Sequence, residues 1–164
     1  MTKEQYLKIS KPLRENEKLS SFVRILNLTV TGVIYVSYPA LMLFFLVTRS
    51  PLFLRCLLVP GIMFVSVSAV RKLINRKRPY EALGFTPVIE KDKRGESMPS
   101  RHVFSAFMIA MTFLYVCPWL SVVFFIFGLI LSAVRIIGGV HYPSDIAAGA
   151  LTGIIAGIIG FFVI

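Results

Sequence analysis

The stretch S97-M-P-S-R-H-V-F-S-A-F107 places an arginine and a histidine directly before an apolar segment. Ser100 is of a type that commonly caps a helix start, and the apolar residues after it suit a helix that crosses a membrane. Ionisable groups are costly at membrane depth, and where they occur they commonly have a function. The stretch therefore predicts a helix that begins at a membrane surface, with its first turn beside a polar site.

The composition extends this prediction to the whole chain. Of the 164 residues, 56% are hydrophobic, which is too many for a soluble domain of this size. Four stretches have the length and apolar character of membrane-spanning helices, and Val103–Val116 is a shorter fifth. The four are Ser21–Val47, Leu52–Val70, Trp119–Ile137 and Ile146–Ile164. We expect an all-α, polytopic transmembrane bundle of about five helices.

We expect a single transmembrane domain over residues 21–164, preceded by a mixed-charge tail over residues 1–20. Two interpretations of the tail stay open: it is solvated and loosely ordered, or it lies on the membrane surface through its apolar side chains. These side chains are Tyr6, Leu7, Ile9 and Leu13.

The net charge and the positions of the cysteines indicate which binding partners to expect. The net charge is +10, and in a membrane protein the expected partners of such a charge are anionic lipid headgroups rather than nucleic acid. Cys56 and Cys117 lie inside apolar stretches with no metal-ligand spacing, so we expect buried apolar thiols. All but two of the 18 lysines and arginines fall on one side of the five predicted helices, Arg49 and Arg55 being the exceptions. For a multi-pass plasma-membrane protein, the positive-inside rule would place that side in the cytoplasm.

Three polar clusters lie on this basic side. In R71-K-L-I-N-R-K-R-P79, Arg71 and Arg78 are two helical turns apart and would share a face if the helix continued to Pro79. A plain basic anchor is the alternative for this cluster. In P99-S-R-H102, Ser100 as a helix cap and the helix dipole would form an anion site, and His102 is either structural or catalytic.

The third cluster is R135-I-I-G-G-V-H-Y-P-S-D145. Pro143 suits the first position of a helix, which places His141 just before the helix and Asp145 in its first turn. Asp145 could then reach back to one imidazole nitrogen and orient His141 as a nucleophile or base.

Together the clusters predict a site for a doubly charged oxyanion. Both histidines of the chain fall in these clusters, together with Arg71, Arg78 and Arg135. The arginine fork binds phosphate oxygens in bidentate fashion. Asp145 is the only acid in the three clusters, which is too few carboxylates for a divalent metal. We expect phosphoryl transfer through histidine without metal or other cofactor.

This pattern resembles the type 2 phosphatidic acid phosphatase superfamily, which is related to glucose-6-phosphatase and the vanadium haloperoxidases. The family motifs are Lys-x6-Arg-Pro, Pro-Ser-Gly-His and Ser-Arg-x5-His-x3-Asp. The corresponding segments here are R71-x6-R78-P79, P99-S-R-H102 and V134-R135-x5-H141-x3-D145. The resemblance runs from about Arg71 to Asp145 and indicates a small bacterial-type member.

The resemblance implies a role for each matching residue. His141 would attack phosphorus to form a phosphohistidine, Asp145 would orient it, and His102 would protonate the leaving oxygen. The phosphate would be bound by Arg71, Arg78, Ser100 and Arg135.

Three positions depart from the family motifs: Arg71 replaces lysine, Val134 replaces serine and Arg101 replaces glycine. Arg101 is a further candidate for phosphate or headgroup binding. The alternative is that Arg101 extends its side chain to lipid headgroups at the surface.

The implied activity is hydrolysis of a lipid phosphate or diphosphate, of the undecaprenyl diphosphate, phosphatidylglycerophosphate or phosphatidic acid type. The alternatives are a phosphotransferase with the same intermediate and a non-catalytic lipid-phosphate carrier or scaffold. Gly149, Gly153 and Gly157 recur at every fourth position of the last helix, a spacing that permits close helix packing. They would pack inside the bundle or, alternatively, form a seam between two copies of the chain.

Overall fold

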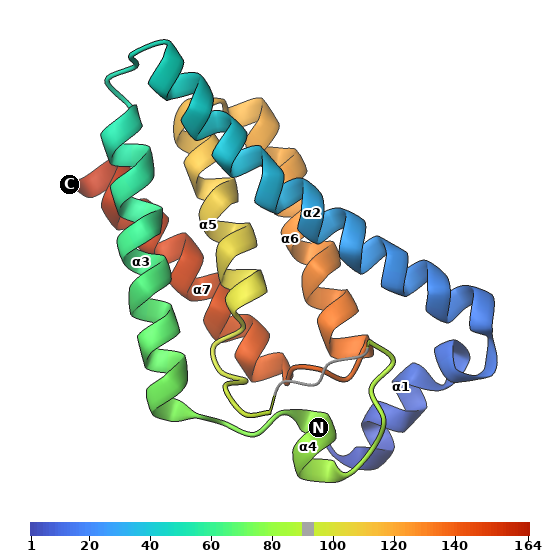
Figure 1. Cartoon of the computed structure of the whole chain (residues 1–164). Helices are drawn as coiled ribbons and strands as arrows, with labels where there is room; N and C mark the ends of the chain where they lie inside the picture. The colour runs from blue at the N-terminus through green and yellow to red at the C-terminus, as the bar shows by residue number, and fades with distance from the viewer. Residues whose placement is uncertain (90–93) are drawn as a thin grey trace.

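The computed structural model describes residues 1–89 and 94–164, and in this part of the chain the regular elements are helices (Figure 1). They are α1 (Lys3–Glu15), α2 (Glu17–Val47), α3 (Phe53–Ile74), α4 (Pro79–Leu83), α5 (Arg101–Val116), α6 (Pro118–Ile137), α7 (Pro143–Ile158) and a final π-helical turn η1 (Ile159–Val163). The long helices α2, α3, α5, α6 and α7 run alternately up and down between two ends, and α1 and α4 lie at one of these ends.

Among the described residues, four segments are long and apolar enough to cross a membrane, and α5 is a shorter apolar helix. The four are Glu17–Val47, Phe53–Leu83, Pro118–Ile137 and Pro143–Val163. The predicted all-α, multi-pass bundle is confirmed. Every residue of α5 from Val103 to Phe113 is buried, so α5 is the central helix of the bundle.

The close contact between α5 and α7 depends on glycine. A Cβ atom added at Gly149 would lie 2.6 Å from the carbonyl oxygen of Ser100, and one added at Gly153 would lie 2.8 Å from that of Phe104. At Gly157 the added atom would lie 2.4 Å from Cβ of Met111. The faces of α7 that carry these glycines are therefore already covered by α5 of the same chain. Packing within the bundle is confirmed, and the seam between copies through these glycines is not supported.

The predicted continuation of one helix from Arg71 to Arg78 is wrong. Helix α3 ends at Ile74, and Asn75 takes a left-handed conformation with φ of 41°. Arg78 is extended, with ψ of 158°, and Pro79 is the first residue of α4. The physical reason is that proline disfavours helical geometry in the residue before it but suits the first turn of a new helix.

The N-terminal tail is not loosely ordered. Thr2 caps α1 with a capping box, and α1 buries Tyr6 and Leu13. Helix α2 starts at Glu17, which is earlier than the predicted boundary at residue 21. Contact of α1 with a membrane surface stays a prediction.

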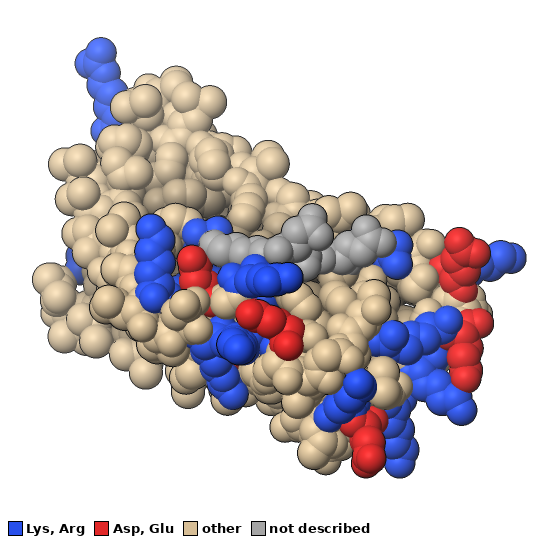
Figure 2. Space-filling view, turned by 60° about the horizontal axis from the view of Figure 1, so that its bottom comes forward, with Lys and Arg blue, Asp and Glu red and all other residues tan. Residues whose placement is uncertain are grey.

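Basic side chains gather at the end of the molecule that carries α1 and α4, which Figure 2 turns toward the viewer. Arg49 lies in the turn between α2 and α3, and Arg55 lies in the first turn of α3, both at the opposite end. The charge asymmetry expected from the sequence is thus present in three dimensions.

Candidate functional site

The site lies where four segments meet at the basic end of the bundle. These segments are the C-terminal part of α3 with the start of α4, the residues before α5, the end of α6 and the start of α7. The backbone N–H of Ser100 donates to the carbonyl oxygen of Asp145 over 2.9 Å, which joins the start of α5 to the start of α7. Helix ends supply unpaired backbone groups, so such joints are typical of sites built from helix termini.

Asp145 and His141 are buried at the start of α7, with exposed fractions of 0% and 1%. Pro143 is the first residue of α7 and Asp145 the third, as predicted, and an Asp145 oxygen accepts from the backbone N–H of Tyr142 over 3.0 Å. The same oxygen lies 3.6 Å from Nδ1 of His141. That separation is too long for a direct hydrogen bond.

Ser97 bridges this gap. Its hydroxyl donates to Oδ2 of Asp145 over 2.5 Å and lies 3.3 Å from Nδ1 of His141. A hydroxyl that donates to a carboxylate still has lone pairs to accept from an imidazole N–H. We infer that Nδ1 carries the proton, which leaves the lone pair on Nε2.

Burial lowers the pKa of His141 to about 4 from its ordinary 6.5, because an imidazolium loses its hydration there. Asp145 opposes this shift of the pKa, while the charges of Arg78 and Arg135 add to it. His141 is therefore a neutral imidazole near neutral pH, which is the form able to act as a nucleophile.

Two buried arginines of the site, Arg78 and Arg71, are held by backbone carbonyl oxygens. Nη1 of Arg78 lies 3.4 Å from Nε2 of His141, and Arg78 also donates to the carbonyl oxygens of Gly95 and Val140 over 3.1 and 3.2 Å. Arg71 donates to the carbonyl oxygens of Pro99 and Glu96. Carbonyl partners fix the orientation of a guanidinium without neutralising it. The site therefore keeps a positive charge that suits an anion.

Two further polar groups are unsatisfied. Arg135 and Ser100 have exposed fractions of 3% and 0%, yet Nε of Arg135 and Oγ of Ser100 have no hydrogen-bond partner among the described residues. Ser100 is the cap residue of α5 by position, as predicted, but its hydroxyl makes no capping bond. An unsatisfied buried donor costs about 1–3 kcal/mol, which a bound oxyanion would relieve. Both groups lie in predicted phosphate-binding positions.

Comparison with known proteins agrees with this geometry. The sequence pattern that defines the PAP2 superfamily matches residues 52–163. The chain belongs to the PAP2 superfamily. The resemblance read from the three motifs is thus confirmed, and the chain is a membrane phosphatase by family.

Two solved structures have a fold similar to that of this PAP2 chain. The crystal structure of Aquifex aeolicus LpxE superposes with a TM-score of 0.74 at 26% sequence identity, over 96% of this chain and 92% of that one. A transmembrane PAP2-type phosphatidylglycerolphosphate phosphatase from Bacillus subtilis gives a TM-score of 0.61 at 20% identity, over 94% and 90% of the two chains. The second likeness concerns the fold alone. No curated protein sequence matched.

His102 and Arg101 of the PAP2 chain point toward α2 and α3. The His102 ring stacks on Tyr35 of α2, with 5.9 Å between ring centroids. The Arg101 guanidinium lies over the Phe64 ring of α3, 5.4 Å from its centroid. Among the predicted site residues, the described contacts thus join Asp145 to His141 and to Ser100. They also join His141 to Arg78. The predicted closeness of His102 to the nucleophile stays a prediction.

Sequence reasoning missed two side chains of the PAP2 site. One is Ser97, and the other is Arg76, which donates from Nη1 to Oδ1 of Asp145 and to Oγ of Ser144, both over 2.8 Å. The Arg76 guanidinium also lies 4.2 Å from the centroid of the Tyr142 ring. Arg76 stands in the basic run before Pro79, but no spacing rule separated it from its neighbours. Only the turn at Asn75 directs it toward Asp145.

The segment 84–100 connects α4 to α5, and residues 90–93 within it lie outside the described part of the chain. The described residues at its end contribute to the site through Ser97 and through the carbonyl groups of Gly95 and Glu96. Within residues 1–89 and 94–164, no group of three or more His, Cys, Asp or Glu side chains forms a potential metal site. Metal independence therefore stays a prediction that activity measurements must test.

Proposed function

We propose that this PAP2 chain hydrolyses the phosphate of a membrane lipid through a phosphohistidine formed on His141. The observation that carries the proposal is the environment of the two ring nitrogens. Nδ1 faces the Ser97–Asp145 pair, and Nε2 lies 3.4 Å from Nη1 of Arg78. A non-catalytic carrier needs the cation but has no use for an oriented, neutral imidazole.

In the first step, the lone pair on Nε2 of His141 forms a bond to phosphorus, and the bond from phosphorus to the lipid oxygen breaks. His102 supplies the proton to the leaving oxygen. The proton on Nδ1 stays in place and is held by Ser97, while Asp145 stabilises the positive ring. In the second step, water attacks phosphorus and loses a proton to His102. The bond from phosphorus to Nε2 breaks, and its electron pair returns to Nε2 of His141.

Arg71, Arg78 and Arg135, together with Ser100, would bind the phosphoryl oxygens through both steps. Phosphoryl transfer spreads charge over these oxygens, so fixed donors contribute most of the catalysis. The unpartnered Nε of Arg135 and Oγ of Ser100 support this assignment, because both are buried and have hydrogen-bonding capacity that a phosphoryl oxygen would satisfy.

The lipid nature of the substrate rests on two observations. The site lies at the ends of helices long and apolar enough to span a membrane, and the Bacillus subtilis protein of similar fold is a phosphatidylglycerolphosphate phosphatase. We place the activity in residues 21–164 as one domain of a multi-pass protein. The basic end of the bundle supports a site at the cytoplasmic face of the plasma membrane.

The test is phosphate release by the purified chain in detergent, from a panel of lipid monophosphates and diphosphates with EDTA present. We expect release by the wild type and none by His141→Ala. With ³²P-labelled lipid, a base-stable, acid-labile phosphoprotein is expected in the wild type. Arg49→Gly, at the opposite end, is the control and should leave turnover unchanged. Activity that requires a divalent metal, or survives in His141→Ala, contradicts the mechanism.

A further inference from the structure

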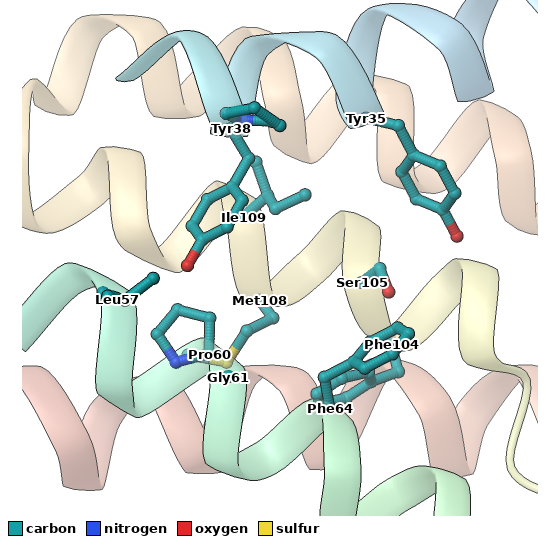
Figure 3. Close-up of a pocket in the computed structure, with 11 residues that line it drawn as sticks. Tyr35, Tyr38, Leu57, Pro60, Gly61, Phe64, Phe104, Ser105, Met108 and Ile109 are labelled. Carbon is teal, nitrogen blue, oxygen red and sulfur yellow. The ribbon is translucent and has the colours of Figure 1, made fainter. Parts of the chain in front are cut away.

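An apolar cleft opens beside the site, between α2, α3 and α5 (Figure 3). Its volume is about 410 Å³, which is within the usual range for pockets that bind small molecules. Tyr38, Pro60 and Met108 are among the side chains that line it. Leu57 and Ile109 lie toward the end away from the site, so the cleft extends into the membrane-spanning part of the bundle.

The first turn of α5 lies between the cleft and the anion site. Tyr35 and Phe64 both line the cleft. The Tyr35 ring stacks on the His102 ring, and the Phe64 ring lies against the Arg101 guanidinium. Arg101 and His102 follow Ser100 directly. If a lipid bound with its phosphate at Ser100, its hydrocarbon chain would pass this turn and enter the cleft.

One wall of the cleft carries an unsatisfied hydroxyl. Ser105 has an exposed fraction of 7%, and its Oγ is buried with no hydrogen-bond partner in the described parts of the chain. Serine and threonine inside helices commonly donate to the carbonyl oxygen four residues earlier. Several residues of this bundle do so, and Ser105 does not. The residues that make this bond are Ser37, Ser66, Thr112, Ser132 and Thr152.

The two other helices that border the cleft repeat the feature. Oγ1 of Thr31 and Oγ of Ser68 are also buried without a partner among the described residues. Thr31 lies one turn from Tyr35 on α2 and Ser68 one turn from Phe64 on α3, in both cases on the side nearer the site and on the same helix face. Each helix around the cleft thus has one buried, unsatisfied hydroxyl on the side nearer the cationic site, and that of Ser105 belongs to a residue that lines the cleft.

We propose that the cleft binds the hydrocarbon chain of the substrate and that Ser105, with Thr31 and Ser68, binds the oxygen atoms that link this chain to the phosphate. The inference rests on the proposed phosphatase function and names its substrate class: phosphates of acylated, ester-linked lipids. Ser105 is five residues beyond Ser100, or about 7.5 Å along the helix axis. An acylglycerol phosphate places ester and hydroxyl oxygens between phosphate and chain at this depth. A polyprenyl phosphate has only carbon there and would leave the hydroxyls unsatisfied.

The test compares two single-chain monophosphates, oleoyl lysophosphatidate and geranylgeranyl phosphate. We expect the wild type to prefer the ester-linked substrate in kcat/KM. Ser105→Ala should lower this preference about 2- to 12-fold, as expected for one neutral hydrogen bond, with little change for geranylgeranyl phosphate. Ser37→Ala, whose hydroxyl donates to the carbonyl oxygen of Val33, should leave the preference unchanged.

A second variant tests the cleft without touching a polar group. Gly61 lines the cleft, and a Cβ added there meets nothing within 4 Å, so Gly61→Leu should fold and fill part of the space. Its kcat/KM should fall at least about 5-fold more for oleoyl than for butanoyl lysophosphatidate, because only the long chain reaches the cleft.

The outcomes separate the two proposals. If the wild type releases phosphate from none of these lipids, the proposed function fails. The further inference alone fails if the wild type prefers geranylgeranyl phosphate, if Ser105→Ala lowers both substrates equally, or if Gly61→Leu affects both chain lengths equally.

Discussion

The two sides of α5 differ sharply in packing. Toward α6 and α7, an added Cβ at Gly128 would lie 3.2 Å from the Phe107 ring, and one at Gly153 would lie 2.8 Å from the Phe104 carbonyl oxygen. Toward α2 and α3, the same helix borders a cleft of about 410 Å³. The close-packed side holds Ser100 against Asp145, where chemistry requires fixed distances. The open side is the one that we propose binds a hydrocarbon chain, for which an approximate fit is sufficient.

The largest expected effect concerns the close-packed side. Asp145→Asn should lower kcat about 10³-fold, about 4 kcal/mol on the barrier, because an amide no longer stabilises the charged His141 ring. Ser97→Ala should cost less, about 10-fold, since the carboxylate stays. Steady-state phosphate release measures both. Equal and small losses would show that the Ser97–Asp145 pair does not act on His141.

The comparison is tested directly by two matched substitutions. Gly153→Ala should lower the free energy of unfolding by about 1–3 kcal/mol, because its Cβ meets backbone of α5. Gly32→Ala, in α2, meets nothing within 4 Å and should be neutral or stabilising by up to about 1 kcal/mol. SDS titration in mixed micelles measures the difference. Equal free energies of unfolding for the two variants would mean that the contact between α5 and α7 is loose enough to accept an added methyl group.

A pH-dependent effect on stability follows from the burial of His141. In His102→Gln, His141 is the only histidine, so ¹⁵N-histidine NMR can follow its titration. We expect a midpoint near the lowered pKa of about 4 rather than 6.5. Between these values the unfolded chain binds a proton that the folded chain does not, so stability should decrease as the pH falls from about 6.5 to about 4. A midpoint near 6.5 would mean that the ring is hydrated.

The smallest expected effect comes from α1. Tyr6 donates its hydroxyl to the carbonyl oxygen of His141 over 3.1 Å, and its ring stacks on Phe85. Burial raises the pKa of Tyr6, so the hydroxyl keeps its proton. Tyr6→Phe keeps the stacking and should lower kcat about 2- to 10-fold, with KM nearly unchanged, because one hydrogen bond that positions His141 is lost. A change in KM alone would instead assign Tyr6 to substrate binding.

Much of the fold was predictable because hydrophobic length and charge are local properties of the chain. The predicted span Trp119–Ile137 differs from α6 by one residue, and Pro143 starts α7 as expected. The site was predictable where spacing fixes geometry, as between His141 and Asp145. Arg76 and Ser97 were missed because their roles depend on turns that bring distant segments together.

The sequence by itself determined a multi-pass helical protein with its cationic clusters at one end, because apolar runs must cross the membrane and helix ends follow from proline, glycine and serine. Only the tertiary structure decided how the clusters are arranged. Asn75 ends α3 and turns the chain, so that Arg78 approaches His141 from the extended segment before α4. Ser97 lies between His141 and Asp145. The tertiary structure also decided that one side of α5 is close-packed and the other open, because that depends on which helices meet α5 and how closely.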